Sequence, residues 1–100
     1  MNYHFKILLI VFISFNFIIA QENINQFKKQ ALLLMQEGRL GEAIDQLNKY
    51  IAGNPRSPDG YHLRGLCQEQ RSQYQNSVLD LRRAYRLDPS NQKIKEDLNR

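Results

Sequence analysis

The sequence predicts an all-α protein, a short α-solenoid in which an apolar leader precedes two copies of a helical hairpin. Three observations predict this fold. From Asn23 onward, apolar residues recur every three or four positions, which is the spacing of one helix face. No stretch alternates apolar and polar residues with period two, so no strand is expected. Residues 24–57 also lie over residues 58–91 without a gap, a shift of 34 positions that indicates an internal repeat.

The first 20 residues have the composition of a secretory signal peptide. Residues 1–6 are a short basic start without an acid, residues 7–20 are almost all Ile, Leu, Val and Phe, and polar residues begin at Gln21. This apolar run is shorter than the roughly 20 residues that a membrane-spanning helix needs. We therefore expect cleavage after Ala20, export to the periplasm or the medium, and no stable membrane insertion of the product. The alternative is an uncleaved N-terminal membrane anchor.

The remaining residues, 21–100, are expected to form one small domain with a mild positive charge. They hold 13 Lys and Arg (14 in the whole chain, less Lys6) against 10 Asp and Glu. The basic residues are scattered among acids, which argues against nucleic-acid binding. Cys67 is the single cysteine, so no disulfide can form within one chain. A domain this small buries a modest core, and we expect low stability alone or support from association.

Breaks in the apolar pattern divide the domain into four helices and a short fifth. The first break covers residues 37–39, and the second lies at Gly53, Asn54 and Pro55, where glycine followed by proline is a helix-stop signal. Ser57 before Pro58 predicts the start of the third helix, with a capping hydroxyl and a proline in the first turn. Further breaks are expected at residues 71–73 and 88–91.

The two segments agree at the positions that packing and turning require. Four pairs are identical across the 34-residue shift, namely Leu32 with Leu66, Gln36 with Gln70, Leu47 with Leu81, and Pro55 with Pro89. Small residues that would let helix axes approach closely stand at Ala31, Ala43, Gly65, Ser77 and Ala84. The last helix, residues 92–100, offers only Ile94 and Leu98 to a core, and it would cover the apolar face of the second hairpin as a capping unit.

In this pattern the chain resembles the tetratricopeptide repeat family, with repeat 1 at 24–57, repeat 2 at 58–91 and a capping helix at 92–100. The residues that carry the resemblance in the first repeat are Phe27, Ala31, Gly38, Ala43 and Pro55, and in the second Tyr61, Gly65, Ser77, Ala84 and Pro89. The sequence departs from the family pattern at Tyr50, where a small residue is usual, and at Ser77, which replaces alanine.

The resemblance implies a non-enzymatic module that binds a peptide or helix of another protein in a concave groove lined by the first helix of each hairpin. Carried onto this sequence, the groove residues are Asn25, Lys28, Leu32, Met35, Gln36, Asp59, His62, Leu66, Glu69, Gln70 and Lys93. The alternative is that the leucines only pack between hairpins and the charges form a solvated face. Some family members grip a terminal carboxylate; Lys28 and Lys93 match that set, but Leu32, Leu63 and Asp97 do not, which argues against such a clamp.

Cys67 and His62 invite a catalytic or metal-binding interpretation. They stand five apart on one expected helix and so point to divergent sides, and a closed metal site lacks donors. We expect Cys67 to be a buried thiol and His62 a solvated or groove residue, and we expect no enzyme activity, catalytic residue, metal or cofactor. The alternative function is structural: because two repeats fall short of the roughly three that solenoids need, the unit would complete a longer solenoid as a homo-oligomer.

Overall fold

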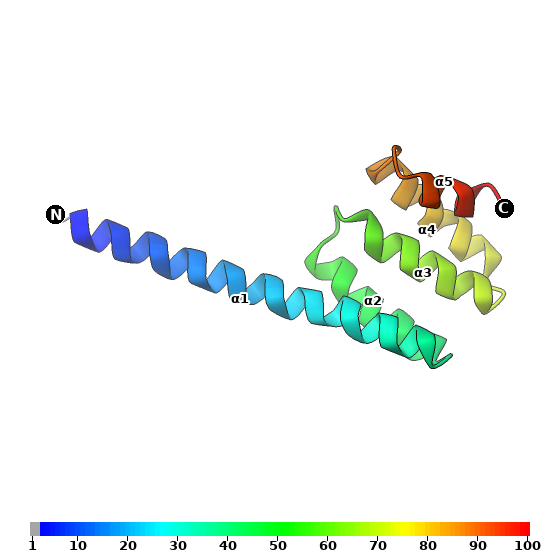
Figure 1. Cartoon of the computed structure of the whole chain (residues 1–100), viewed down its shortest axis with the longest axis horizontal. Helices are drawn as coiled ribbons and strands as arrows, with labels where there is room; N and C mark the ends of the chain where they lie inside the picture. Colours follow the sequence, from blue (N-terminus) through cyan, green and yellow to red (C-terminus); the bar gives the residue numbers. More distant parts are fainter. Residues whose placement is uncertain (1–2) are drawn as a thin grey trace.

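The computed structural model describes residues 3–100, in which five helices are joined by short turns and no strand is present. Five helices follow one another: α1 (Tyr3–Gln36), α2 (Leu40–Gly53), α3 (Pro58–Gln70), α4 (Tyr74–Leu87) and α5 (Gln92–Leu98). Helix α2 packs on α1 and on α3, α3 packs on α4, and α5 lies against α4 (Figure 1). The prediction of an all-α fold is confirmed, and the expected breaks coincide with the ends of the helices.

Helix bounds recur at a constant distance along the chain. α2 and α4 begin 34 positions apart, at Leu40 and Tyr74, and they end 34 positions apart, at Gly53 and Leu87. The turns that precede these helices also correspond, because each contains one residue with positive φ, Gly38 at 75° and Ser72 at 61°. In both turns, the amide of the residue that follows the positive-φ residue donates a hydrogen bond to the carbonyl five residues earlier. Arg39 N lies 2.9 Å from Leu34 O, and Gln73 N lies 2.8 Å from Gln68 O. The two hairpins are therefore turned in the same way.

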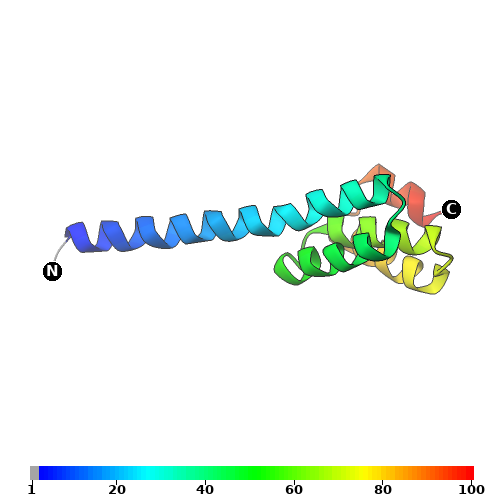
Figure 2. The same ribbon diagram turned by 90° about the horizontal axis from the view of Figure 1, so that it is seen from below.

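Helix α1 is uninterrupted over 34 residues, and no break marks Ala20. Its first half projects away from the other helices (Figures 1 and 2), and every residue from 3 to 20 is exposed. Contact with the domain begins at Ile24, which approaches Gly53 so closely that a Cβ there would lie 2.8 Å from Ile24 Cγ1. α1 is long and apolar enough to cross a membrane, and its place at the N-terminus is equally compatible with a signal sequence.

Two buried clusters hold the domain together. Ala31, Ala43, Leu47 and Cys67 join α1, α2 and α3, and a second cluster joins α3, α4 and α5. The second consists of Tyr61, Ala84 and Ile94. The small residues expected to permit close helix approach are all buried, and they are Ala31, Ala43, Gly65, Ser77 and Ala84.

Helix α5 covers only part of α4, which corrects the expectation that it would cover the apolar face of the second hairpin. Ile94 is fully buried and Leu98 is half-buried, but Tyr74 and Leu79 are both 62% exposed. The reason is length, because α5 has 7 residues and α4 has 14. At about 1.5 Å per residue, a helix as short as α5 cannot run along the whole of α4.

The prediction that the Ser57 hydroxyl caps α3 is also wrong. Ser57 occupies the position before the helix, but its side chain makes no capping hydrogen bond. Its hydroxyl instead lies 3.3 Å from the hydroxyl of Tyr50, a buried residue of α2. Helix α5 does have a side-chain cap, since the Ile94 amide donates to Asn91 Oδ1 at 3.1 Å.

Candidate partner-binding surface

The groove residues expected from the sequence lie on α1, α3 and α5, and an ion pair and a hydrogen bond link these three helices. Lys28 Nζ on α1 lies 2.8 Å from Asp59 Oδ2 on α3. Further along α3, His62 Nε2 lies 2.7 Å from Asp97 Oδ2 on α5. Because these contacts join each helix to the next, the side chains that make them gather on a shared side of the domain.

The apolar members of this set differ in exposure. Leu32 is 41% exposed, and it lines a shallow hollow of about 250 Å³ with Asn25, Lys28 and Lys29. Met35 and Leu66 are half-buried. Met35 packs against the first core cluster, as the alternative of simple packing expects, whereas Leu32 keeps much of its surface free.

Two glutamines complete the surface. Gln36 and Gln70 are exposed and are the last residues of α1 and α3. They are also one of the pairs that are identical across the 34-residue shift. Their amide groups can both donate and accept hydrogen bonds, so they suit contact with a peptide backbone.

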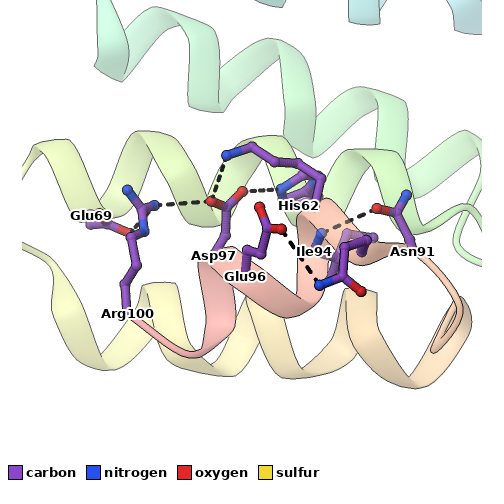
Figure 3. Close-up of polar contacts among 9 residues, drawn as sticks. His62, Glu69, Asn91, Ile94, Glu96, Asp97 and Arg100 are labelled. Carbon is purple, nitrogen blue, oxygen red and sulfur yellow. Dashed lines mark hydrogen bonds and ion pairs between the residues drawn. The ribbon is translucent and has the colours of Figure 1, made fainter.

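Asp97 is the centre of a polar network that holds α5 against α3 (Figure 3). Its side chain is 1% exposed, and it accepts hydrogen bonds from His62 Nε2 at 2.7 Å and from Lys93 Nζ at 3.0 Å. Arg100 Nη2 lies 3.4 Å away and also bonds to Glu69 at 3.1 Å. Burial alone would raise the pKa of Asp97. The hydrogen bonds from His62 and Lys93 lower it by more than burial raises it, so the pKa lies below its ordinary value.

The network bears on the expectation that His62 is a solvated or groove residue. Its side chain is only 14% exposed and is hydrogen-bonded to Asp97, so it is not solvated, while its groove role stays a prediction. From the sequence, Asp97 is noted only because it does not match the residues that grip a terminal carboxylate. Its spacing of four from Lys93 and three from Arg100 is a helix-surface pairing pattern that could have indicated part of the network.

A second polar network, which the sequence analysis missed, joins α2, α3 and α4. Arg64 donates to Asp80 through Nε at 2.6 Å and Nη2 at 2.8 Å, and to Asn48 Oδ1 through Nη1 at 2.9 Å. Asp80 is buried, and its hydrogen bonds hold the pKa of Arg64 above its ordinary value. Arg64 stands 16 positions from Asn48 and 16 positions from Asp80, and each of the three lies on a different helix. No pattern within one helix therefore indicates the contact.

Cys67 is a buried thiol, as predicted. It is fully buried in the first core cluster, and burial raises its pKa, which disfavours the reactive thiolate. His62 faces α5 instead, so the two side chains do not form one site. Residues 3–100 contain no group of three or more side chains placed to hold a metal ion. The absence of enzyme activity stays a prediction.

No protein-family model matches this sequence, and no similar protein was found among curated proteins. The function is therefore inferred from the residues and geometry of the chain itself.

Proposed function

We propose that this chain is an exported protein whose domain, residues 21–100, is a tetratricopeptide-type module that binds another protein without catalysing a reaction. One observation carries the proposal: the 34-residue shift found in the sequence recurs in the helix bounds and in the positive-φ turns at Gly38 and Ser72. Chains built in this way present the first helix of each hairpin, here α1 and α3, to a partner.

The surface on α1, α3 and α5 supports an uncharged partner segment better than a charged one. Its charged side chains are engaged with one another, as in the pair of Lys28 with Asp59 and the pairs around Asp97. What remains open is the exposed part of Leu32 and the amides of Gln36 and Gln70. We propose that a helix or extended segment contributes apolar side chains to Leu32 and backbone groups to the amides.

Self-association into a longer solenoid has weaker support. A second copy stacked head to tail would meet the outer face of α1, whose residues Gln26, Lys29, Gln30 and Leu33 are all exposed. Three of these four are polar, so the face offers little apolar surface to a neighbour. The exposed apolar half of α1, residues 3–20, fits export, because no part of the domain packs on it.

Site-specific photocrosslinking in cells tests this function. A photoreactive amino acid at Leu32, Gln36 or Gln70 should form an adduct with one and the same partner protein. The matched control is Asp45, an exposed residue on α2, which should give no such adduct. The proposal fails if no groove position gives a protein adduct, or if Asp45 gives the same adduct as the groove positions.

A further inference from the structure

The outer face of α4 carries an exposed apolar surface on its N-terminal half. We call it the α4 patch; it consists of Tyr74, Gln75, Val78, Leu79 and Arg82, which together line one shallow hollow. Residues spaced by three or four lie side by side on a helix surface, as 74 and 78, 75 and 79, and 78 and 82 do, so these side chains form a continuous strip. Tyr74 and Leu79 are both 62% exposed; α5 ends at Leu98, beside Tyr74, and Leu79 lies on the side of α4 opposite the buried Ser77 and Leu81.

A second hollow, of about 270 Å³, adjoins the α4 patch where α5 ends. Tyr74 and Val78 line both hollows, and Leu81 and Leu98 add apolar surface to the second. The two together form an apolar trough that runs along α4 beyond the end of α5. A helix lying in this trough would pack beside α4.

The charge beside the α4 patch is positive, whereas the second hollow is lined by Glu69, Asp97 and Arg100, which pair with one another. Asp80 is the single acidic residue of α4, and it is buried against Arg64. Arg82 and Arg86 are exposed on the outer face, and neither forms an ion pair with any residue between 3 and 100. The trough therefore offers apolar contacts beside unpaired guanidinium groups.

We propose that the α4 patch binds a helix of a partner protein in which an apolar stripe is flanked by carboxylates. Carboxylates would pair with Arg82 and Arg86, and the stripe would cover Tyr74, Val78 and Leu79. The five residues of the α4 patch all lie on α4 and none is a groove residue, although the adjoining hollow includes Glu69 of the groove. The proposal therefore does not rest on the groove function.

Two other occupants fit less well. A second copy of the chain would bring another α4 face without a free carboxylate, so the arginines of both copies would stay unpaired. While residues 1–20 remain attached, a membrane is disfavoured by position, because the turn from α3 to α4 lies at the end of the molecule away from the N-terminus in both views (Figures 1 and 2). A bilayer that holds the apolar half of α1 would thus be remote from the start of α4.

A fluorophore at the patch tests the proposal on the full chain in phosphatidylcholine nanodiscs. Bimane is attached at Gln75→Cys in the patch and, as the control, at Gln30→Cys on α1; the native Cys67 is buried and protected from labelling. The probes are two synthetic helical peptides of about 18 residues with the same leucine stripe, flanked by Glu in one and by Lys in the other. We expect a blue shift at Gln75→Cys alone, with half-saturation at about tenfold lower concentration for the Glu peptide, as two exposed ion pairs allow.

Charge reversal supplies the decisive comparison. Arg82→Glu should abolish or invert the preference for the Glu peptide, whereas Arg56→Glu, the same change at an exposed site outside the patch, should leave it intact. Leu79→Ser should weaken both peptides, whereas Leu33→Ser should weaken neither. Circular dichroism checks that each variant is folded.

Four results would overturn the proposal. These are equal affinity for the two peptides, equal effects of Arg82→Glu and Arg56→Glu, a blue shift at Gln75→Cys on anionic nanodiscs without peptide, and a blue shift that grows with protein concentration alone. The third result would assign the patch to a membrane and the fourth to a second copy.

Discussion

At the scale of single residues, α3 approaches α2 at a position that has no side chain. A Cβ at Gly60 would lie 2.6 Å from Ile51 Cγ1 and 2.9 Å from Tyr50 Cδ1. Tyr50 is buried, and Ile51 is partly buried, so neither can move aside freely. We expect Gly60→Ala to lower the free energy of unfolding by about 1–3 kcal/mol, measured by urea denaturation, because overpacking outweighs the gain in helix propensity.

The matched control is Gly41→Ala in the first turn of α2. A Cβ there would contact only the guanidinium end of Arg71, at 3.0 Å, and this flexible side chain can shift. The free energy of unfolding should stay the same or rise by up to about 1 kcal/mol. A loss of stability as large as that of Gly60→Ala would contradict the packing explanation.

Asp97 predicts a dependence of stability on pH. Its pKa is lower in the folded than in the unfolded chain, since burial is outweighed by the hydrogen bonds from His62 and Lys93. The ionised carboxylate therefore stabilises the fold above the unfolded pKa of about 3.9, and this contribution is lost as the pH falls through the folded pKa. Arg100, which also faces Asp97, and Glu69, which pairs with Arg100, belong to the same network.

We expect Asp97→Asn to lower the free energy of unfolding at neutral pH by about 1–3 kcal/mol, because His62 and Lys93 lose a charged acceptor. Between about pH 5 and pH 2 the variant should lose less stability than the natural chain, because it lacks this titrating group. Urea denaturation over that pH range measures both effects. Parallel pH profiles of the two proteins would show that Asp97 does not contribute in this way.

Sequence reasoning at this scale succeeded for side chains that belong to a periodic stripe and failed for polar pairs. Cys67 stands on the apolar face of α3, so its burial followed from its spacing. His62 and Asp97 are 35 residues apart, and their contact exists only after α5 folds back on α3. The hydroxyl of Ser57 likewise pairs with the hydroxyl of Tyr50 on α2 instead of capping α3, and this contact depends on a residue of another helix.

At the scale of elements, the ends of the helices could be predicted because glycine, proline and polar residues interrupt the stripes. Two features could not. Helix α1 continues across Ala20 because no helix-breaking residue stands between the apolar leader and the domain. The bare half of α4 depends on where α5 lies against it, which the spacing of Ile94 and Leu98 does not specify.

Because the first half of α1 is exposed, we expect its removal to leave the stability of the domain unchanged. A chain that starts at Gln21 should unfold cooperatively in a urea titration, because residues 3–20 contribute no buried side chain and Ile24 stays in place. A chain that starts at Lys28 also loses Ile24 and Phe27, and we expect its free energy of unfolding to be lower by about 2–5 kcal/mol. Equal stability of the two shortened chains would show that residues 21–27 contribute little to the packing of α1 on α2.

At the scale of the whole molecule, α1 allows two products from one chain. If residues 1–20 are removed, the domain is released after export; if they are kept, α1 holds it at a membrane. The helix as a whole is long and apolar enough to span, but its apolar part, residues 7–20, is about 21 Å long at 1.5 Å per residue, against a hydrocarbon thickness of about 30 Å. This mismatch favours removal over anchoring.

We therefore expect the exported protein to begin at Gln21, which intact-mass measurement of the protein from the exported fraction can establish. Ala20→Arg places a large charged residue at a site that requires a small one, so this variant should keep its N-terminus and stay in the membrane fraction. Gln30→Arg, with the same new charge in an exposed position of the domain, should be processed normally. A full-length natural chain that resists carbonate extraction would instead establish α1 as an anchor, and the domain would then act at the membrane surface on partners within reach of α1.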